Sequence, residues 1–275
     1  MMRFDMHCHT KYGSIDAKPP IRDYVKLLKE KGYHGMLVTD HDSYRGYFRW
    51  REKHPEDDPD FTVLCGIEYD TRDAGHFLVI LPDGIYLEAL TMRGMDVMTL
   101  LMLVHEYGGI IGPAHPFGVR SSSAMFFNKL REKPELLRRF DFVEAFNACE
   151  SHESNRLATL LAEDYNKPSF GGSDSHDHKY IGMAYTDFYQ PIRCNNDVIR
   201  AVKERSNIEA GGKERGVTFK SKHKEAFYSI YGFMAFNQSL GAIFYPFRKM
   251  RIKQALKNKP DYTSFRPENT DSTVR

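Results

Sequence analysis

The chain opens with Arg3-Phe4-Asp5-Met6-His7-Cys8-His9, and this stretch decides how the remaining sequence is interpreted. We predict a short strand over residues 3–6, followed at its end by two histidines with one residue between them. Because side chains on extended backbone alternate between two faces, His7 and His9 should point to one side and Cys8 to the other. Two neutral imidazoles held close together can bind one divalent metal ion. A His-x-His pair is common by chance, so its meaning depends on the rest of the chain.

Five further segments place histidine or a carboxylate at the end of an apolar, strand-like run. They are Thr39-Asp40-His41-Asp42, Gly66-Ile67-Glu68, Gly75-His76, Ala114-His115-Pro116 and Gly172-Ser173-Asp174-Ser175-His176. In a parallel α/β barrel the ends of the strands converge on one pocket, so segments distant in sequence become neighbours in space. This pattern is typical of a metal site at one end of a barrel.

Composition and charge restrict the class of protein. The 275 residues can bury a substantial core, and the 39 Lys and Arg residues nearly balance the 37 Asp and Glu residues. A formal net charge of +2 gives no global argument for nucleic-acid or membrane binding, so local charge must hold any anionic substrate. The four scattered cysteines form no C-x-x-C pair, which indicates reduced thiols. Because the chain begins directly with a predicted strand, we expect no signal peptide and a cytoplasmic protein.

Strands and helices alternate along the first 210 residues, which predicts a single α/β domain with a parallel barrel. The predicted helices cover residues 21–32, 43–54, 96–107, 151–165 and 196–205, from apolar periodicity and flanking Pro and Gly. The predicted strands that follow the first one cover residues 34–39, 61–67, 77–81, 110–114, 140–146 and 168–171.

Residues 211–275 differ in character and form a predicted C-terminal extension. It begins with a glycine-rich charged turn over 211–216, continues with an aromatic-rich segment over 227–247 between basic clusters, and ends in a polar, flexible tail. Ser229, Asn237 and Pro246 interrupt the aromatic segment, which argues against a membrane span. We expect it to pack on the barrel. The alternatives are peripheral contact of residues 227–253 with an anionic membrane, or an oligomer contact.

The candidate metal ligands share a mixture of imidazole and carboxylate groups and contain no cysteine. They are His7, His9, Asp16, Asp40, His41, Glu68, His76, His115, Asp174 and His176. One histidine after a strand is usually structural, but six strand ends that all carry such groups are hard to explain by packing. Imidazole and carboxylate ligands suit Zn, Mn or Fe(II), and about ten ligands exceed the needs of one ion. We therefore predict two or three divalent metal ions.

These segments, in this order, resemble the motif set of the PHP (polymerase and histidinol phosphatase) family over residues 1 to about 210. The resemblance implies a distorted (β/α)7, TIM-like barrel and a metal-dependent phosphoesterase. By position, a first metal would be held by His7, His9, Glu68 and Asp174. Glu68 would bridge to a second metal bound also by His76 and His115, and a third would be held by Asp16, His41 and His176.

One position departs from the family pattern. Many members place the carboxylate for the third metal two positions before Asp16, where this chain has Ser14. We therefore assign that ligand to Asp16. Asp40 could also be a ligand, but we expect it to orient an imidazole from behind.

The chemistry of such a site suggests phosphoester hydrolysis. A hydroxide that bridges two metal ions is available near neutral pH, because the cations lower the pKa of bound water, and it could attack phosphorus. Asp174 or Asp40 would move the proton. Arg120, shortly after His115, is the cation best placed to contact phosphate.

The substrate is less constrained than the reaction. The balanced charge favours a small phosphorylated molecule or a nucleotide over nucleic acid. The alternatives are an exonuclease or phosphodiesterase acting on nucleic-acid ends, and a non-catalytic metal-binding interaction module. The sequence leaves the oligomeric state open.

Overall fold

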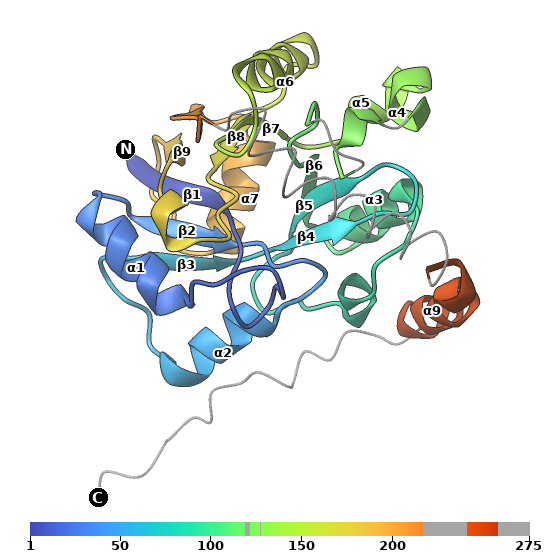
Figure 1. The fold of residues 1–275 in the computed structure, drawn as a ribbon, viewed down its shortest axis with the longest axis horizontal. Coiled ribbons are helices and arrows are strands. Elements are labelled where there is room, and N and C mark those ends of the chain that lie inside the picture. The colour runs from blue at the N-terminus through green and yellow to red at the C-terminus, as the bar shows by residue number, and fades with distance from the viewer. Residues whose placement is uncertain (119–121, 127, 217–240, 258–275) are drawn as a thin grey trace, which may run out of the picture.

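The computed structural model describes residues 1–118, 122–126, 128–216 and 241–257, and these form a mixed α/β fold (Figure 1). The described strands belong to three hydrogen-bonded sheets, and helices cover their outer sides. Within the described residues, no helix is both long enough and apolar enough to cross a membrane.

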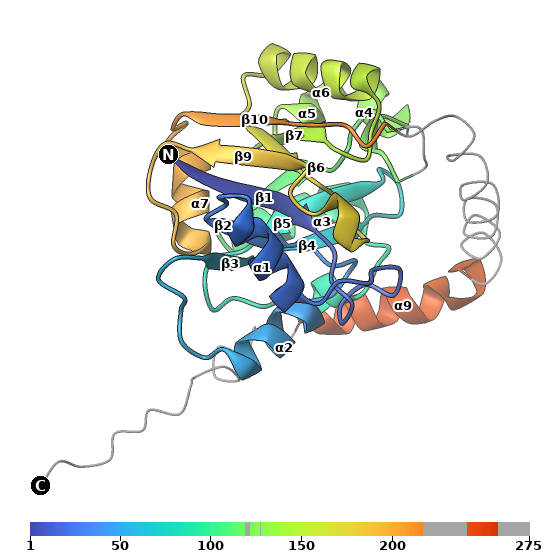
Figure 2. The ribbon, with the colours of Figure 1, turned by 60° about the vertical axis from the view of Figure 1, so that its left-hand side comes forward.

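The largest sheet has five strands in the order β10-β9-β1-β2-β3. The parallel part consists of β1 (Met2–Cys8), β2 (Gly35–Val38) and β3 (Thr62–Cys65). Strand β9 (Ala184–Phe188) runs antiparallel both to β1 and to β10 (Ile208–Gly212). Figure 2 shows β10, β9 and β1 side by side. Neither β9 nor β10 was predicted from the sequence, and β10 occupies the start of the turn expected at 211–216.

Two smaller sheets complete the framework. An antiparallel sheet contains β4 (Ile67–Asp70), β5 (His76–Ile80) and β6 (Ile110–Pro113). A parallel pair contains β7 (Val143–Asn147) and β8 (Ser169–Gly172). The strands predicted near 77–81, 110–114, 140–146 and 168–171 are thereby confirmed.

The helices predicted over 21–32, 43–54, 96–107, 151–165 and 196–205 are confirmed, with shorter bounds. Ser151 and Asp96 begin two of them, because their side chains accept hydrogen bonds from the backbone N–H groups of Ser154 and Thr99. The described helices are α1 (Ile21–Glu30), α2 (Arg45–Lys53), α3 (Val97–Glu106), α4 (Asn128–Glu132), α5 (Pro134–Leu137), α6 (His152–Asp164), α7 (Asn195–Lys203) and α9 (Gly241–Ala255). Three short 3₁₀ helices are η1 (Glu88–Thr91), η2 (Ala124–Phe126) and η3 (His178–Tyr180).

The predicted closed, all-parallel (β/α)7 barrel is not confirmed. The chain between β4 and β5 is too short for the crossover that parallel neighbours require, so this pair is antiparallel. The single strand predicted over 61–67 divides at Gly66 into β3, which pairs with β2, and β4, which pairs with β5. A Cβ on Gly66 would lie 3.0 Å from the side chain of Leu37 and 3.0 Å from the carbonyl oxygen of Val79, so any larger residue would crowd the point where the chain changes sheets.

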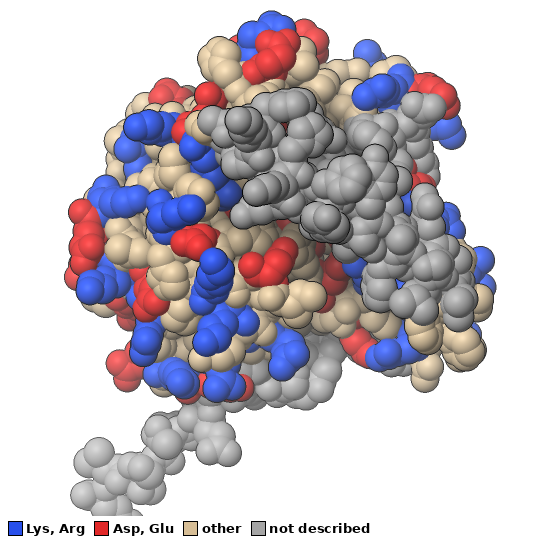
Figure 3. All heavy atoms as spheres, in the orientation of Figure 1, with Lys and Arg blue, Asp and Glu red and all other residues tan. Residues whose placement is uncertain are grey.

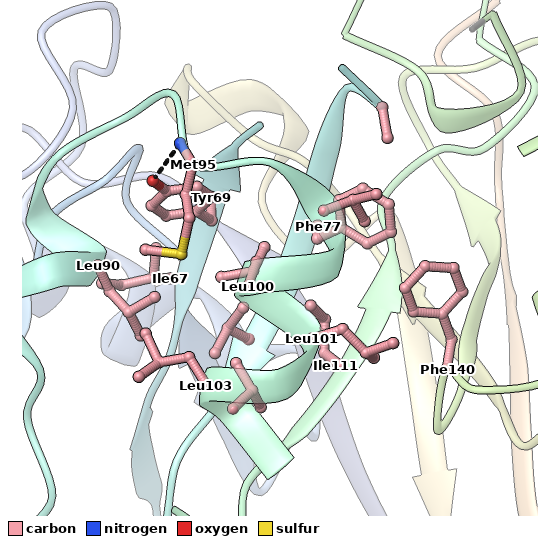
Figure 4. Packing of buried hydrophobic residues seen from close by; sticks show 14 of the residues in the cluster. Ile67, Tyr69, Phe77, Leu90, Met95, Leu100, Leu101, Leu103, Ile111 and Phe140 are labelled. Atoms are coloured by element: carbon pink, nitrogen blue, oxygen red, sulfur yellow. Dashed lines mark hydrogen bonds between the residues drawn. The ribbon is translucent and has the colours of Figure 1, made fainter. Parts of the chain in front are cut away.

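Two hydrophobic clusters hold the sheets in place. One packs α3 against the antiparallel sheet, where Leu100 and Leu101 contact a layer that includes Tyr69, Phe77 and Ile111 (Figure 4). The other is enclosed by strands of all three sheets and contains Phe4, Phe142, Phe170 and Phe188, with ring pairs at 4.2–6.0 Å. The three sheets therefore surround a common core although their hydrogen bonding does not close.

The C-terminal extension is described only in part. Residues 227–240 of the aromatic-rich segment and the tail 258–275 lie outside the described residues, whereas 241–247 form the beginning of α9. Helix α9 packs beside η1, and the Arg72 guanidinium donates to the hydroxyl of Tyr245. The division at residue 210 stays a prediction, and β10 continues across it.

Candidate metal centre

His7 and His9 lie at the carboxyl end of β1 with their Nε2 atoms 3.0 Å apart. Both side chains are fully buried. Cys8 points the other way, into a cluster with Tyr24 and Val38. The alternation expected from the sequence is confirmed, and it directs two imidazoles at one point.

Two carboxylates approach the same point from other strands. Glu68 Oε2, from β4, lies 3.5 Å from His7 Nε2 and 3.2 Å from His9 Nε2. Asp174 Oδ1, after β8, lies 3.7 Å and 3.3 Å from the same two nitrogens. A tetrahedral ion with bonds of about 2.0–2.1 Å separates its ligand atoms by about 3.4 Å. The measured separations bracket this value, so the group has the dimensions of a metal site.

Glu68 is shared between two groups of histidines. Its Oε1 lies 2.8 Å from His76 Nδ1 and 2.9 Å from His115 Nε2. Its buried Oε2 has no partner in hydrogen-bond geometry among the described residues, although His41 Nδ1 comes within 3.0 Å. A buried carboxylate oxygen surrounded by imidazole nitrogens is better satisfied by a cation than by protein groups. Glu68 therefore has the position of a bridging ligand.

A third group lies at the exposed edge of the site. Asp16 Oδ2 is 3.3 Å from His176 Nε2 and 3.6 Å from His41 Nε2. The rings of His9 and His176 stack with centroids 4.1 Å apart. The Asp16 side chain is 52% exposed, which distinguishes this group from the buried one at His7 and His9.

The turns that carry two of these side chains have unusual backbone. Asp174 has φ of 48° and His115 has φ of 29°, in the left-handed region that non-glycine residues rarely adopt. The backbone N–H of Asp174 donates to the carbonyl of His7 at 2.8 Å, which ties its turn to β1. Such strain is stored where a side chain must be aimed at a site.

Glu144, in β7, supports two histidines from behind. Its Oε1 accepts from His7 Nδ1 at 2.8 Å, and its Oε2 accepts from the backbone N–H of His115 at 2.6 Å. Asn147 donates to the same carboxylate at 3.1 Å. A carboxylate on Nδ1 fixes the tautomer and leaves Nε2 of His7 free to bind a metal. Glu144 and Asn147 thus support the histidines from the end of one strand.

Asp40 also stands behind the site. One oxygen accepts from the backbone N–H of Thr10 at 2.6 Å, and the other accepts from the Thr10 hydroxyl at 2.7 Å. Ser14 connects Asp40 to His9, because its hydroxyl lies 3.0 Å from Asp40 Oδ1 and 3.2 Å from His9 Nδ1. Ser14, at the position that departs from the family pattern, thus orients a histidine, and the nearby carboxylate at the site edge is that of Asp16.

Charge in the centre is strongly coupled. Burial opposes charge on the rings, but neighbouring carboxylates raise the pKa of His7 and His41 well above the usual value and that of His115 to about 9. Burial and the charge of His176 instead lower the pKa of His9 to about 4. Burial favours the neutral form of Glu68, but the surrounding histidines hold its pKa well below the usual value. The carboxylates therefore hold protons on these histidines in the metal-free centre, and a bound cation would take the place of those protons.

Comparisons with known sequences match parts of the chain. Residues 152–207 match the family model described as PHP-associated. An uncharacterised protein of Methanocaldococcus jannaschii, MJ0417, is 36% identical over 107 residues, which are 38% of this chain and 45% of that protein. The chain thus matches less than half the length of this relative.

Solved structures share the fold. A two-domain protein of Bacteroides vulgatus that contains a predicted PHP-like metal-dependent phosphoesterase has a TM-score of 0.58 and 19% identity, over 77% of this chain and 65% of that one. This likeness shows a shared fold, and the matched PHP-associated family model covers residues 152–207 of the chain. Endonuclease Q, in complex with a 27-mer duplex that carries an abasic lesion, has a TM-score of 0.56 and 16% identity, over 82% of this chain and 67% of that one.

Two arginines near the candidate metal centre escaped the sequence analysis. Arg215 donates to the carbonyl oxygens of Ser173, at 2.7 Å, and of Asp174, and so holds the ligand-bearing turn. Arg93 pairs with Asp70, whose Oδ1 lies 3.7 Å from His76 Nε2. Neither belongs to a motif, and both reach the site only through the fold. Arg120, the predicted phosphate contact, lies outside the described residues.

Proposed function

We propose that this protein belongs to the PHP family and is a metal-dependent phosphoesterase that hydrolyses a phosphate ester of a small molecule or nucleotide. The observation that carries the proposal is the position of Glu68 between two groups of imidazoles, one of which has tetrahedral dimensions. Phosphoryl transfer needs positioning and charge neutralisation more than covalent catalysis, and a centre with several cations supplies both.

The proposed ligand sets follow the three groups of side chains. His7, His9, Glu68 and Asp174 would hold the first ion, and His76 and His115 would join Glu68 at the second. Asp16, His41 and His176 would hold a third at the exposed edge. The ligands suit Zn, Mn or Fe(II), and do not choose among them.

When bound, the cations would polarise the phosphoryl group and make water more acidic. The chain's own residues then have separate tasks. Glu144 holds the proton on Nδ1 of His7, so Nε2 is the nitrogen that would give up its proton to a metal, and Ser14 orients His9. Asp174, whose Oδ1 faces both histidines, is the carboxylate that we propose moves a proton. The oxygens of Asp40 are occupied by Thr10 and Ser14, so we propose that it positions the site instead of moving a proton. The phosphate contact of Arg120 stays a prediction.

A nuclease is the second candidate. The fold is shared with Endonuclease Q, whose structure contains a DNA duplex, and phosphodiester cleavage uses the same type of metal centre. The two candidates differ in whether the substrate is a phosphomonoester or a phosphodiester.

The proposal can be tested by measuring hydrolysis of a phosphomonoester, p-nitrophenyl phosphate, and of a phosphodiester, bis-p-nitrophenyl phosphate. Zn, Mn and Fe(II) are added in separate reactions. Wild type should turn over the monoester faster, and His9→Ala should lose more than about 100-fold, because removal of groups that only support a metal ligand already costs 10–100-fold. His54→Ala, an exposed histidine at the end of α2, is the matched control and should retain activity. Preference for the diester would favour the nuclease. Metal binding without hydrolysis of either ester would leave a non-catalytic binding module.

A further inference from the structure

Helix α9 exposes three large apolar side chains to solvent. Phe244 is 51% exposed, and Phe247 and Met250 are each 62% exposed. Their spacing of three residues places them along one side of the helix. Scattered apolar residues on a surface need no explanation, but three in a row on one helix form a continuous strip.

A row of lysines lies beside this apolar strip. Lys249, Lys253 and Lys257 are all exposed and follow one another at intervals of four residues, which aligns them on a neighbouring side of the helix. With Arg248 and Arg251, the segment 241–257 carries five cations and contains no Asp or Glu. These five charges exceed the formal net charge of the whole chain, +2, so positive charge is concentrated here.

The remaining side of α9 is attached to the protein. Ile252 and Ala255 are buried, and Tyr245 accepts a hydrogen bond from Arg72. The apolar strip is therefore not the side that the helix uses to join the core. In Figure 3, tan and blue spheres lie at the position of α9, at the lower right, whereas the basic side chains over α1 and α2, at the left, are mixed with acidic ones.

We propose that the outward side of α9 docks on the surface of an anionic phospholipid bilayer. Phe244, Phe247 and Met250 would enter the boundary between headgroups and acyl chains, and the lysine row would contact the headgroups. Apolar side chains beside a row of cations are one feature of helices that lie in the membrane interface; α9 also carries apolar residues, Ile252 and Ala255, on the side that packs on the protein. A nucleic-acid backbone would attract the lysines equally, and unstacked bases could stack on the phenylalanines, but neither gives Met250 an apolar partner. The contact is peripheral and does not depend on the proposed phosphoesterase activity.

The proposal can be tested by sedimenting the full chain with vesicles. A chelator is present so that the metal centre plays no part. Phosphatidylcholine vesicles that contain phosphatidylglycerol should bind the protein, pure phosphatidylcholine vesicles should bind it much less, and added salt should weaken the binding. Replacing the lysine row by Lys249→Gln, Lys253→Gln and Lys257→Gln should reduce the partition coefficient roughly 100-fold, at about fivefold for each lysine. Phe244→Ser with Phe247→Ser should reduce it by at least about tenfold.

A variant with the same change in net charge is the control. Lys26→Gln, Lys53→Gln and Lys133→Gln remove three exposed lysines from other elements and should leave vesicle binding within about twofold of wild type, provided that thermal unfolding shows all variants to be folded. The proposal is overturned if wild type does not sediment with anionic vesicles, or if the control lysines matter as much as those of α9. It is also overturned if the α9 lysines are needed to bind a single-stranded oligonucleotide while vesicles are not bound, because α9 would then be a nucleic-acid surface.

Discussion

Replacement of Glu144 by glutamine should weaken metal binding although Glu144 touches no metal. Its two oxygens accept from His7 Nδ1 at 2.8 Å and from the backbone N–H of His115 at 2.6 Å. Glutamine has nearly the same shape but offers only one acceptor oxygen. The amide group of the Glu144→Gln variant must therefore face one of these two donors.

Either orientation of the new amide has a calculable consequence. If its NH₂ faces the backbone of His115, a buried donor is left without a partner, at about 1–3 kcal/mol. If its NH₂ faces His7, Nδ1 of His7 must become the acceptor, and the ring proton moves to Nε2, where it blocks the metal. Loss of such supporting groups typically costs 10–100-fold in metal affinity, about 1.4–2.8 kcal/mol. We expect a reduction within this range.

Competition with a chromophoric chelator measures this change. Glu153→Gln on α6 is the control, since it is the same substitution at a side chain that is 63% exposed and paired with Arg156. It should leave metal affinity unchanged. A folded Glu144→Gln protein that binds metal as tightly as wild type would show that Glu144 does not set the tautomer of His7, and the reasoning would fail.

Three further predictions concern protonation, positioning and the core. Because the pKa values of His7, His41 and His115 are raised, these histidines are protonated in the metal-free protein at neutral pH. Metal loading should therefore release more than one proton per chain, and the apparent metal affinity should rise as the pH approaches the His115 pKa of about 9. Calorimetry in buffers of different ionisation enthalpy measures the proton release, and metal uptake without proton release would contradict the assignment. Arg215→Met should lower turnover by roughly tenfold or more, because the carbonyl groups of Ser173 and Asp174 lose their shared hydrogen-bond donor. Arg215→Lys should retain part of the turnover that Arg215→Met loses. Steady-state kinetics at matched metal loading measures both variants, and equal turnover in the two would refute this role. Phe77→Ala should lower the free energy of unfolding by about 3–5 kcal/mol, because Phe77 is fully buried in the core. Met102→Ala, at an exposed position of α3, should change that free energy by less than about 0.5 kcal/mol. Equal changes in the free energy of unfolding, measured by urea titration, would contradict the packing shown in Figure 4.

The candidate ligands that local patterns singled out lie close together in the structure, whereas the sheets were predicted less completely. The side on which His7 and His9 lie follows from the alternation of a strand, which needs no knowledge of the rest of the fold. The helices could be located from apolar periodicity, and the buried strands from short apolar runs.

Long-range features were less accessible. The chain changes sheets at Gly66, and a glycine inside an apolar run gives no sign of that change. β10 contains Ala210, Gly211 and Gly212, whose low strand propensity is overridden by pairing with β9. Arg215 follows directly, so the same segment that was interpreted as a turn carries the cation that holds Asp174. Closure of a barrel depends on register between distant strands, and no local pattern specifies it.

The central claim is that Glu68 joins two metal positions. Its most direct test is to measure the metal content of the purified protein by mass spectrometry and the turnover of the same sample. Wild type should contain two or three ions per chain, and Glu68→Gln should lose at least two of them and its turnover, because one carboxylate serves both groups of histidines. A Glu68→Gln protein that keeps the metal content and turnover of wild type would contradict the account.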